Sequence, residues 1–185
     1  LGILEKTLPF VDVFVTSLEE LLQTMLPEKY AKIQSMPGNT KFVDKTPLDL
    51  IKNIGRRVIN TGVKILLIKM GHRGAYLLTG DVSSINKKLE TNLQEEKWNN
   101  REILCNAYKI DQSKVLHATG AGDTAVAAFL SAILDGESPD MAIKFAAIAG
   151  RDNLYCESIF NDICNLNQVT EKIGDGAFFD VTIPD

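Results

Sequence analysis

The feature that most constrains this chain is the stretch 114–134, in which a short apolar run enters a glycine-rich bend and then an apolar helical pattern. Residues 114–118 predict a strand and residues 124–134 a helix, joined by Thr119, Gly120, Ala121, Gly122 and Asp123. The amides of Gly120, Ala121 and Gly122 should point outward at the positive end of a helix that begins near Asp123. Such a bend suits a phosphate group.

Asp123 beside this bend has two interpretations. A carboxylate next to a bound polyphosphate opposes binding electrostatically, but it is useful if it accepts a proton from an attacking hydroxyl. Acidic residues are also favoured in the first turn of any helix. Spacing alone does not decide between the two.

A dinucleotide site is the competing interpretation of the bend. Residues 120–125 also fit the GxGxxA variant of the dinucleotide fingerprint. That motif needs a further strand after the helix, whereas Ser138 and Pro139 predict the start of another helix there. The GxxxxGK[ST] phosphate loop is missing from the sequence.

Strand and helix patterns alternate along the rest of the chain. Strands are predicted at 10–15, 64–68, 75–79 and 102–110, and helices from the Ser17 cap, from Thr46 and Pro47 to Gly62, from 138 to 150 and around 163–173. Residues 27–45 read as loop and 83–100 as a polar insertion. The alternation predicts one α/β domain, residues 1–185, with a mostly parallel sheet covered on both faces.

Composition limits the possible functions. The net charge of −4 argues against a nucleic-acid binder, and the longest apolar stretch is too short to span a membrane. Cys105, Cys156 and Cys164 form no CxxC pair, which favours reduced thiols in a cytoplasmic protein over a zinc site. The sequence begins at Leu1 rather than methionine, so an initial segment is expected to be missing.

Three segments, in this order along the chain, resemble the PfkB/ribokinase family of carbohydrate kinases: VDVFVTSLEEL (11–21), IKMGHRG (68–74) and ATGAGDTAVAAFL (118–130). The resemblance covers about residues 10–150. It implies a ribokinase-like three-layer sandwich, ATP and Mg²⁺ as cofactors, and a sugar, sugar acid or nucleoside as phosphate acceptor. The N-terminal part of the family fold is apparently lacking, so the isolated chain is expected to be inactive, and either self-association or a companion portion is expected.

The resemblance also assigns roles to residues. Asp123 would be the base, with the amides of Gly120, Ala121 and Gly122 as the anion hole; the nucleotide would contact Lys69, Gly71, Gly74 and Thr119. The two glycines could instead serve only a hairpin turn, and Lys69 could be an ordinary solvated lysine. Glu20 would help to hold Mg²⁺, although Ser17 and Glu20 also form a capping box by themselves.

Two departures from the family pattern keep a second function open. Ser17 replaces the family's asparagine, and His117 stands where many members have aspartate, which puts a monovalent-cation site in doubt. A relative that binds nucleotide or sugar without turnover is therefore the alternative, and a dinucleotide oxidoreductase is the less favoured one.

Overall fold

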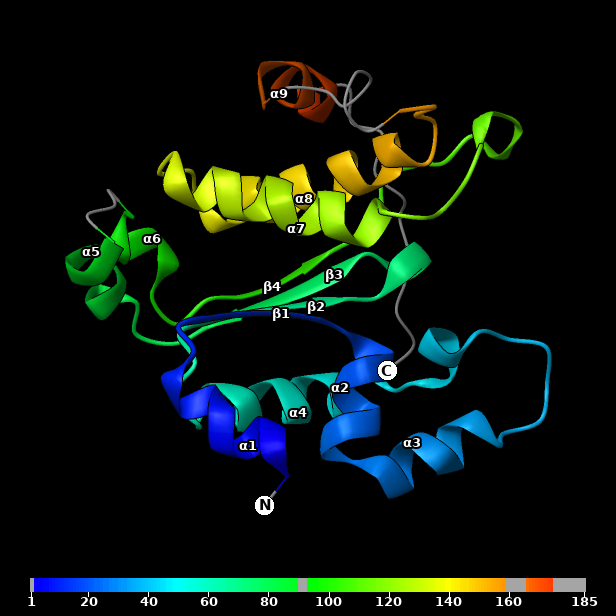
Figure 1. Ribbon diagram of the computed structural model, residues 1–185, viewed down its shortest axis with the longest axis horizontal. Coiled ribbons are helices and arrows are strands. Elements are labelled where there is room, and N and C mark those ends of the chain that lie inside the picture. Colours follow the sequence, from blue (N-terminus) through cyan, green and yellow to red (C-terminus); the bar gives the residue numbers. More distant parts are fainter. Residues whose placement is uncertain (1, 90–92, 159–165, 175–185) are drawn as a thin grey trace.

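Among the residues that the structure describes, the central sheet has four strands in the order β1-β2-β3-β4. The computed structural model describes residues 2–89, 93–158 and 166–174. The strands are β1 (Val13–Ser17), β2 (Ile65–Lys69), β3 (Ala75–Thr79) and β4 (Glu102–Cys105). The expected α/β class is confirmed, because helices cover both faces of this sheet (Figure 1).

The helices divide between the two faces. One face carries α1 (Ile3–Thr7), α2 (Leu18–Met25), α3 (Pro27–Gln34) and α4 (Leu48–Ile59). The other carries α7 (Ala121–Leu134) and α8 (Pro139–Asn153), with α9 (Leu166–Gly174) beyond them, while α5 (Ser83–Leu89) and α6 (Glu95–Trp98) lie at one end of the sheet (Figure 1). Short 3₁₀ turns complete the described elements: η1 (Leu8–Phe10), η2 (Phe42–Lys45), η3 (Gly71–Arg73) and η4 (Gln112–Lys114).

The prediction of a mostly parallel sheet is wrong. Only β1 and β2 pair in parallel, with Ser17 opposite Lys69; β2–β3 and β3–β4 are antiparallel. For β2 and β3 the reason is the length of their connection, which is little more than the η3 turn. Antiparallel strands accept such a short connection, whereas a parallel crossover needs a dozen residues or more.

Two apolar layers hold the sheet between the helices. Alternate residues of β2 point to opposite faces, so that Ile65 and Leu67 pack toward α7 and α8 while Leu66 and Ile68 pack toward α2 and α4. All four side chains are fully buried. The central strands are therefore apolar on both faces, which explains why the sequence shows short continuous runs there instead of alternation.

Several boundaries differ from the sequence predictions. Residues 27–34 form α3 instead of loop, and α4 begins at Leu48 with Pro47 as its cap. The predicted strand 114–118 is absent: Lys114 ends η4, and the N–H of Leu116 donates to the carbonyl of Leu154 instead of to a strand. Asp111 favours this turn, because its side chain accepts from the N–H of Ser113.

The stretch 83–100 is not a detached insertion. Trp98 is fully buried, its indole N–H donates to the carbonyl of Glu137 at 2.9 Å, and its ring meets Phe129 edge-on. This tryptophan therefore ties α6 to the α7–α8 hairpin. The predicted closing helix is present as α9, with Val169 buried; Ile163 lies outside the described residues.

One side of the molecule leaves apolar surface uncovered. β1 is an edge strand within the described sheet, and β1 and α7 both lie toward the viewer in Figure 1. On α7, Leu130 and Leu134 remain 37% and 63% exposed, although this helix is apolar on every side. An all-round apolar helix is normally buried, so this side has the character of an interface. Within the described residues, no helix is long and apolar enough to cross a membrane.

Candidate active site

The glycine bend keeps most of the geometry expected of an anion site. Gly120 is the N-cap of α7 with φ +82°, a conformation that glycine adopts without steric cost. Within the described part of the chain, the N–H groups of Gly120 and Gly122 have no hydrogen-bond acceptor. Ala121 departs from the expectation, because its N–H donates to the carbonyl of Ala118 at 3.3 Å.

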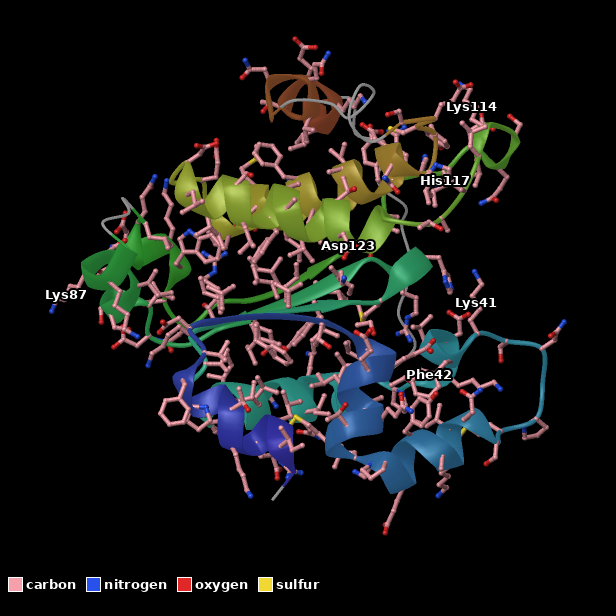
Figure 2. All side chains as sticks on the ribbon, viewed as in Figure 1. Lys41, Phe42, Lys87, Lys114, His117 and Asp123 are labelled. Carbon is pink, nitrogen blue, oxygen red and sulfur yellow. The ribbon has the colours of Figure 1, made fainter. Side chains whose placement is uncertain are left out.

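Asp123 lies in the first turn of α7 with an exposed side chain. The helix begins at Ala121, three residues before the predicted range 124–134, so the carboxylate sits in the same turn as the unpaired amides of Gly120 and Gly122. Figure 2 places Asp123 at the end of α7, between that helix and the sheet. The acid and the unpaired amides therefore share one small region of the surface.

Lys69 connects this bend to the sheet. It ends β2, and its Nζ donates to the carbonyl oxygen of Gly122 at 3.3 Å. A Cβ on Gly122 would lie 3.1 Å from the same Nζ, which is tighter than an ordinary contact. The sequence predicted that Lys69 reaches toward a phosphate; in this structure its ammonium group lies against the bend that would hold one.

Glu20 faces Lys69 from the neighbouring strand end. The predicted capping box is confirmed: Ser17 Oγ accepts from the N–H of Glu20 at 3.2 Å, and Glu20 Oε2 accepts from the N–H of Ser17 at 3.1 Å. Hydrogen bonding to the Glu20 carboxylate, first from the Ser17 side chain and then from the Ser17 backbone N–H, holds the pKa of Glu20 below its ordinary value, and the charge of Lys69 lowers it further. Glu20 is thus an ionised, exposed carboxylate at the carboxyl end of β1.

An open cleft of about 680 Å³ adjoins the bend on the Glu20 side. Its walls come from the β1–α2 junction, the region around η2 and the end of β2, and they include Ser17, Glu19, Glu20, Lys41, Lys69 and His72. Asp123 and the glycine bend do not line it. Lys69 lines the cleft and contacts the bend, so it is the point at which the two regions meet.

The two glycines of the GHRG turn have different surroundings. Gly71 lines the cleft with φ +55°, and a Cβ there would meet no atom within 4 Å. Gly74 has φ +88°, and a Cβ there would lie 2.0 Å from the carbonyl oxygen of Cys105. The structure therefore brings Gly71, but not Gly74, to the open surface of the site. Thr119 is exposed in the turn just before Gly120.

Two buried polar residues near the site were not singled out from the sequence. Arg73, within the turn, donates through Nη1 to the carbonyls of Val43 and Thr46, the latter at 3.0 Å, and burial lowers the pKa of its guanidinium group. Asn153, at the end of α8, lies against Gly120. Arg73 lies within the IKMGHRG segment and Asn153 lies outside the three quoted segments, but the burial of both depends on how distant segments pack.

Two other expectations can be compared with the structure. His117 is exposed in the segment before the bend (Figure 2), and no group of three His, Cys, Asp or Glu side chains that could hold a metal forms among the described residues. The helix α8 follows α7 directly, so the further strand that a dinucleotide fingerprint requires does not follow the bend.

Comparisons with known proteins bear on the family and the fold. The sequence model of the pfkB family carbohydrate kinases matches residues 4–152. A ribokinase of Arabidopsis thaliana is 34% identical over 118 residues, which is 61% of this chain and 26% of that protein. The solved structure of Arabidopsis thaliana ribokinase complexed with ribose and ATP matches with a TM-score of 0.61 at 22% identity, over 90% of this chain and 42% of the other.

A putative ribokinase II of E. coli in complex with ATP and Mg²⁺ is similar in fold, with a TM-score of 0.61 at 16% identity, over 93% of this chain and 42% of the other. This chain therefore spans less than half the length of these relatives. The family match covers most of the chain, from the first helix to the end of α8. The chain thus belongs to the pfkB family of carbohydrate kinases.

Proposed function

We propose that this chain forms the nucleotide-binding and catalytic portion of an ATP-dependent kinase that phosphorylates a hydroxyl group of a sugar, sugar acid or nucleoside. The observation that carries the proposal is the contact between Lys69 and Gly122, which joins the strand-end segment to the glycine bend. A cation, free amides and an exposed acid then surround one place on the surface. Phosphoryl transfer depends mainly on such positioning and charge stabilisation.

Each group has a distinct part in this proposal. The amides of Gly120, Ala121 and Gly122 stabilise the charge on the transferred phosphoryl group, assisted by the positive end of α7. The bond from Ala121 to Ala118 is long enough to be exchanged for a bond to a phosphate oxygen. Asp123 accepts the proton of the acceptor hydroxyl as that oxygen attacks. Lys69, Gly71 and Thr119 contact the remaining phosphates, and Gly74 shapes the turn.

Glu20 fits a supporting role toward Mg²⁺. Its pKa lies below the ordinary value and its side chain is exposed, so the carboxylate is available to the cation or to its water ligands. Mg²⁺ in such sites keeps several waters and takes only one or two protein carboxylates, and it would neutralise part of the phosphate charge.

The second candidate function is a relative that binds nucleotide without turnover. The capping box favours it, because Ser17 holds Glu20 at the helix start where the family pattern has an asparagine. A binding protein still needs the bend and Lys69, but it has no use for an acid at position 123. The two functions therefore differ in what a change at Asp123 does.

The test compares Asp123→Asn with the unchanged sequence in ATP binding and in phosphoryl transfer. ATP binding with Mg²⁺ is measured by calorimetry on the 185-residue chain, where we expect the variant to bind as tightly as the original or more tightly. Transfer from γ-labelled ATP is screened against sugars, sugar acids and nucleosides. Because the chain spans less than half of its relatives, we expect little or no turnover from it alone. Turnover is therefore measured in the complete protein that contains these residues.

For a kinase, the asparagine variant should lose at least about 100-fold in turnover, the usual contribution of a general base. Turnover that survives this change would exclude Asp123 as the base. A complete protein that binds ATP but transfers phosphate to none of these acceptors would favour the binding function. Robust sugar phosphorylation by the 185 residues alone would contradict the expectation that the isolated chain is inactive.

A further inference from the structure

Asn153 is a buried amide with nothing to bind in the described structure. It is the last residue of α8 and is 0% exposed. Neither its Oδ1 nor its Nδ2 has a hydrogen-bond partner among the residues described. Burying an amide in this way is unfavourable by a few kcal/mol. Its neighbour Asp152 is almost as buried, but it pairs with Arg151 at 3.1 Å and with Lys172 at 2.5 Å.

The amide of Asn153 lies against the first residue of the glycine bend. A Cβ placed on Gly120 would be 3.5 Å from Nδ2 and 3.8 Å from Oδ1 of Asn153. Any side chain at position 120 would therefore fill the space between the bend and this amide. Gly120 is also the residue that needs a positive φ and whose N–H lacks an acceptor in the described part. The unpaired Nδ2 and Oδ1 of Asn153 and the unpaired backbone N–H of Gly120 thus lie at the same place in the structure.

Close packing of α7 against α8 fixes this arrangement. A Cβ on Gly150 would lie 3.1 Å from the carbonyl oxygen of Ala121, so the two helices nearly touch at the start of α7. The N–H of Leu116 donates to the carbonyl of Leu154 at 2.8 Å, which holds the segment before the bend against the end of α8. Asn153 sits between these two attachments, where a small movement of the bend would bring its backbone within hydrogen-bonding distance.

We propose that Asn153 is a positioning residue of the phosphate-binding bend. The anion hole is then narrowed to the amides of Ala121 and Gly122. When a phosphate draws these two amides toward itself, the N–H of Gly120 donates to Oδ1 of Asn153 instead of to the phosphate, and Nδ2 of Asn153 donates to a carbonyl of the same bend. These bonds stabilise the left-handed conformation that the phosphate requires. The inference rests on the proposed function, since it assumes that phosphate binds at this bend. It adds that phosphate binding supplies hydrogen-bond partners to an amide that is buried without one in the described structure.

The proposal makes two opposite predictions for Asn153→Leu, which replaces both polar atoms at similar volume. Without ligand, the variant should unfold at the same temperature as the original or at a higher one, because an unpaired buried amide has been removed. Pyrophosphate and ATP, titrated calorimetrically into the 185-residue chain, should bind about 10-fold more weakly, the loss expected for one or two hydrogen bonds. If a buried water already satisfied Asn153, the leucine variant would melt lower and bind equally well, and that result overturns the proposal.

Asn153→Asp decides the case in which the leucine variant both melts lower and binds more weakly. A buried aspartate without a partner has a raised pKa, so at pH 5.5 it is mainly a neutral acid with one donor and one acceptor, as the amide has. At pH 5.5 the aspartate variant should bind pyrophosphate about as tightly as the original protein. At pH 8 it should bind at least about 10-fold more weakly than the original, because its carboxylate repels the anion. A ratio that does not change with pH overturns the inference.

Ser84→Ala is the matched control. Ser84 Oγ is also buried without a partner in the described structure, but it belongs to α5, at the opposite end of the sheet from the bend (Figure 1). This variant should leave pyrophosphate affinity unchanged. Failure of the unchanged chain to bind pyrophosphate or ATP would overturn the proposed function and this inference together. Binding that is the same in the original, leucine and aspartate proteins would overturn the inference alone.

Discussion

The two glycines of the GHRG turn allow a structural role to be separated from a role at the site. Gly74 has φ +88° and ψ −134°, a backbone region open essentially to glycine alone. A Cβ there would lie 2.0 Å from the carbonyl oxygen of Cys105 and 2.6 Å from the carbonyl carbon of Asn106. Gly71, three residues earlier, has φ +55° and open space around the same atom. The same substitution at the two positions should therefore have very different effects.

The magnitudes follow from these contacts. For Gly74→Ala, the strained backbone contributes about 1–3 kcal/mol and displacement of the chain after β4 about 1–3 kcal/mol more, so we expect a loss of about 2–6 kcal/mol. For a chain of 185 residues this corresponds to a melting temperature lower by about 4–24 °C. Gly71→Ala meets only the left-handed backbone preference, about 1 kcal/mol or about 2–4 °C.

The stability of both variants is measured in two ways: by thermal melting, followed by circular dichroism, and by urea unfolding, followed by the fluorescence of the buried Trp98. ATP titrations well below the melting temperature complete the comparison. We expect Gly71→Ala to weaken ATP binding while remaining stable, because its new methyl group points into the cleft. Equal losses of stability in the two variants would refute the steric argument. An unchanged ATP affinity for Gly71→Ala would remove Gly71 from the proposed nucleotide site.

Three further predictions concern other parts of the molecule. Ser17→Ala should lower the free energy of unfolding by about 1 kcal/mol and raise the pKa of Glu20. A lowered carboxylate pKa stabilises the fold above the unfolded pKa, and this effect is lost as pH falls through the folded value. The difference in unfolding free energy between the original protein and the variant, measured by urea melts, should therefore narrow between pH 7 and pH 3. Burial raises the pKa of Cys105 to about 11, so iodoacetamide at pH 8 should modify it slowly in the native protein and rapidly in urea, as followed by mass spectrometry. Replacing Leu130 and Leu134 by lysine should reduce any self-association in sedimentation experiments and change stability by less than about 1 kcal/mol.

Local patterns in the sequence predicted the elements whose stability is local. The capping box of Ser17 and Glu20, the Ser138–Pro139 start of α8 and the apolar runs of β2 and β3 all correspond to observed elements. Each depends on residues only a few positions apart. The direction of β3 was within reach of the same reasoning, because the short Gly71–Gly74 connection cannot carry a parallel crossover.

Features that arise from packing between distant segments could not be predicted in this way. The contact of Lys69 with Gly122 joins residues that are far apart in sequence, and the position of Asn153 against Gly120 depends on how α8 meets α7. Residues 114–118 have the composition of a strand, but the main chain there bonds to the end of α8. Tertiary contacts overrode the local preference at this point.

The position of β1 also bears on how the chain folds and opens. Only the η3 turn separates β2 from β3 among the described elements, and the short helices α5 and α6 separate β3 from β4. Strand β1 reaches β2 only after α2, α3, η2 and α4 have been traversed. Closing that long segment costs chain entropy, and in the described sheet no strand covers the other edge of β1. Amide hydrogens of β1 should therefore exchange before those of β2 and β3. When β1 separates from β2, Glu20 would move away from the site, whereas Lys69 would keep its contact with Gly122. The site would then temporarily lack the Glu20 carboxylate but keep the Lys69 ammonium group.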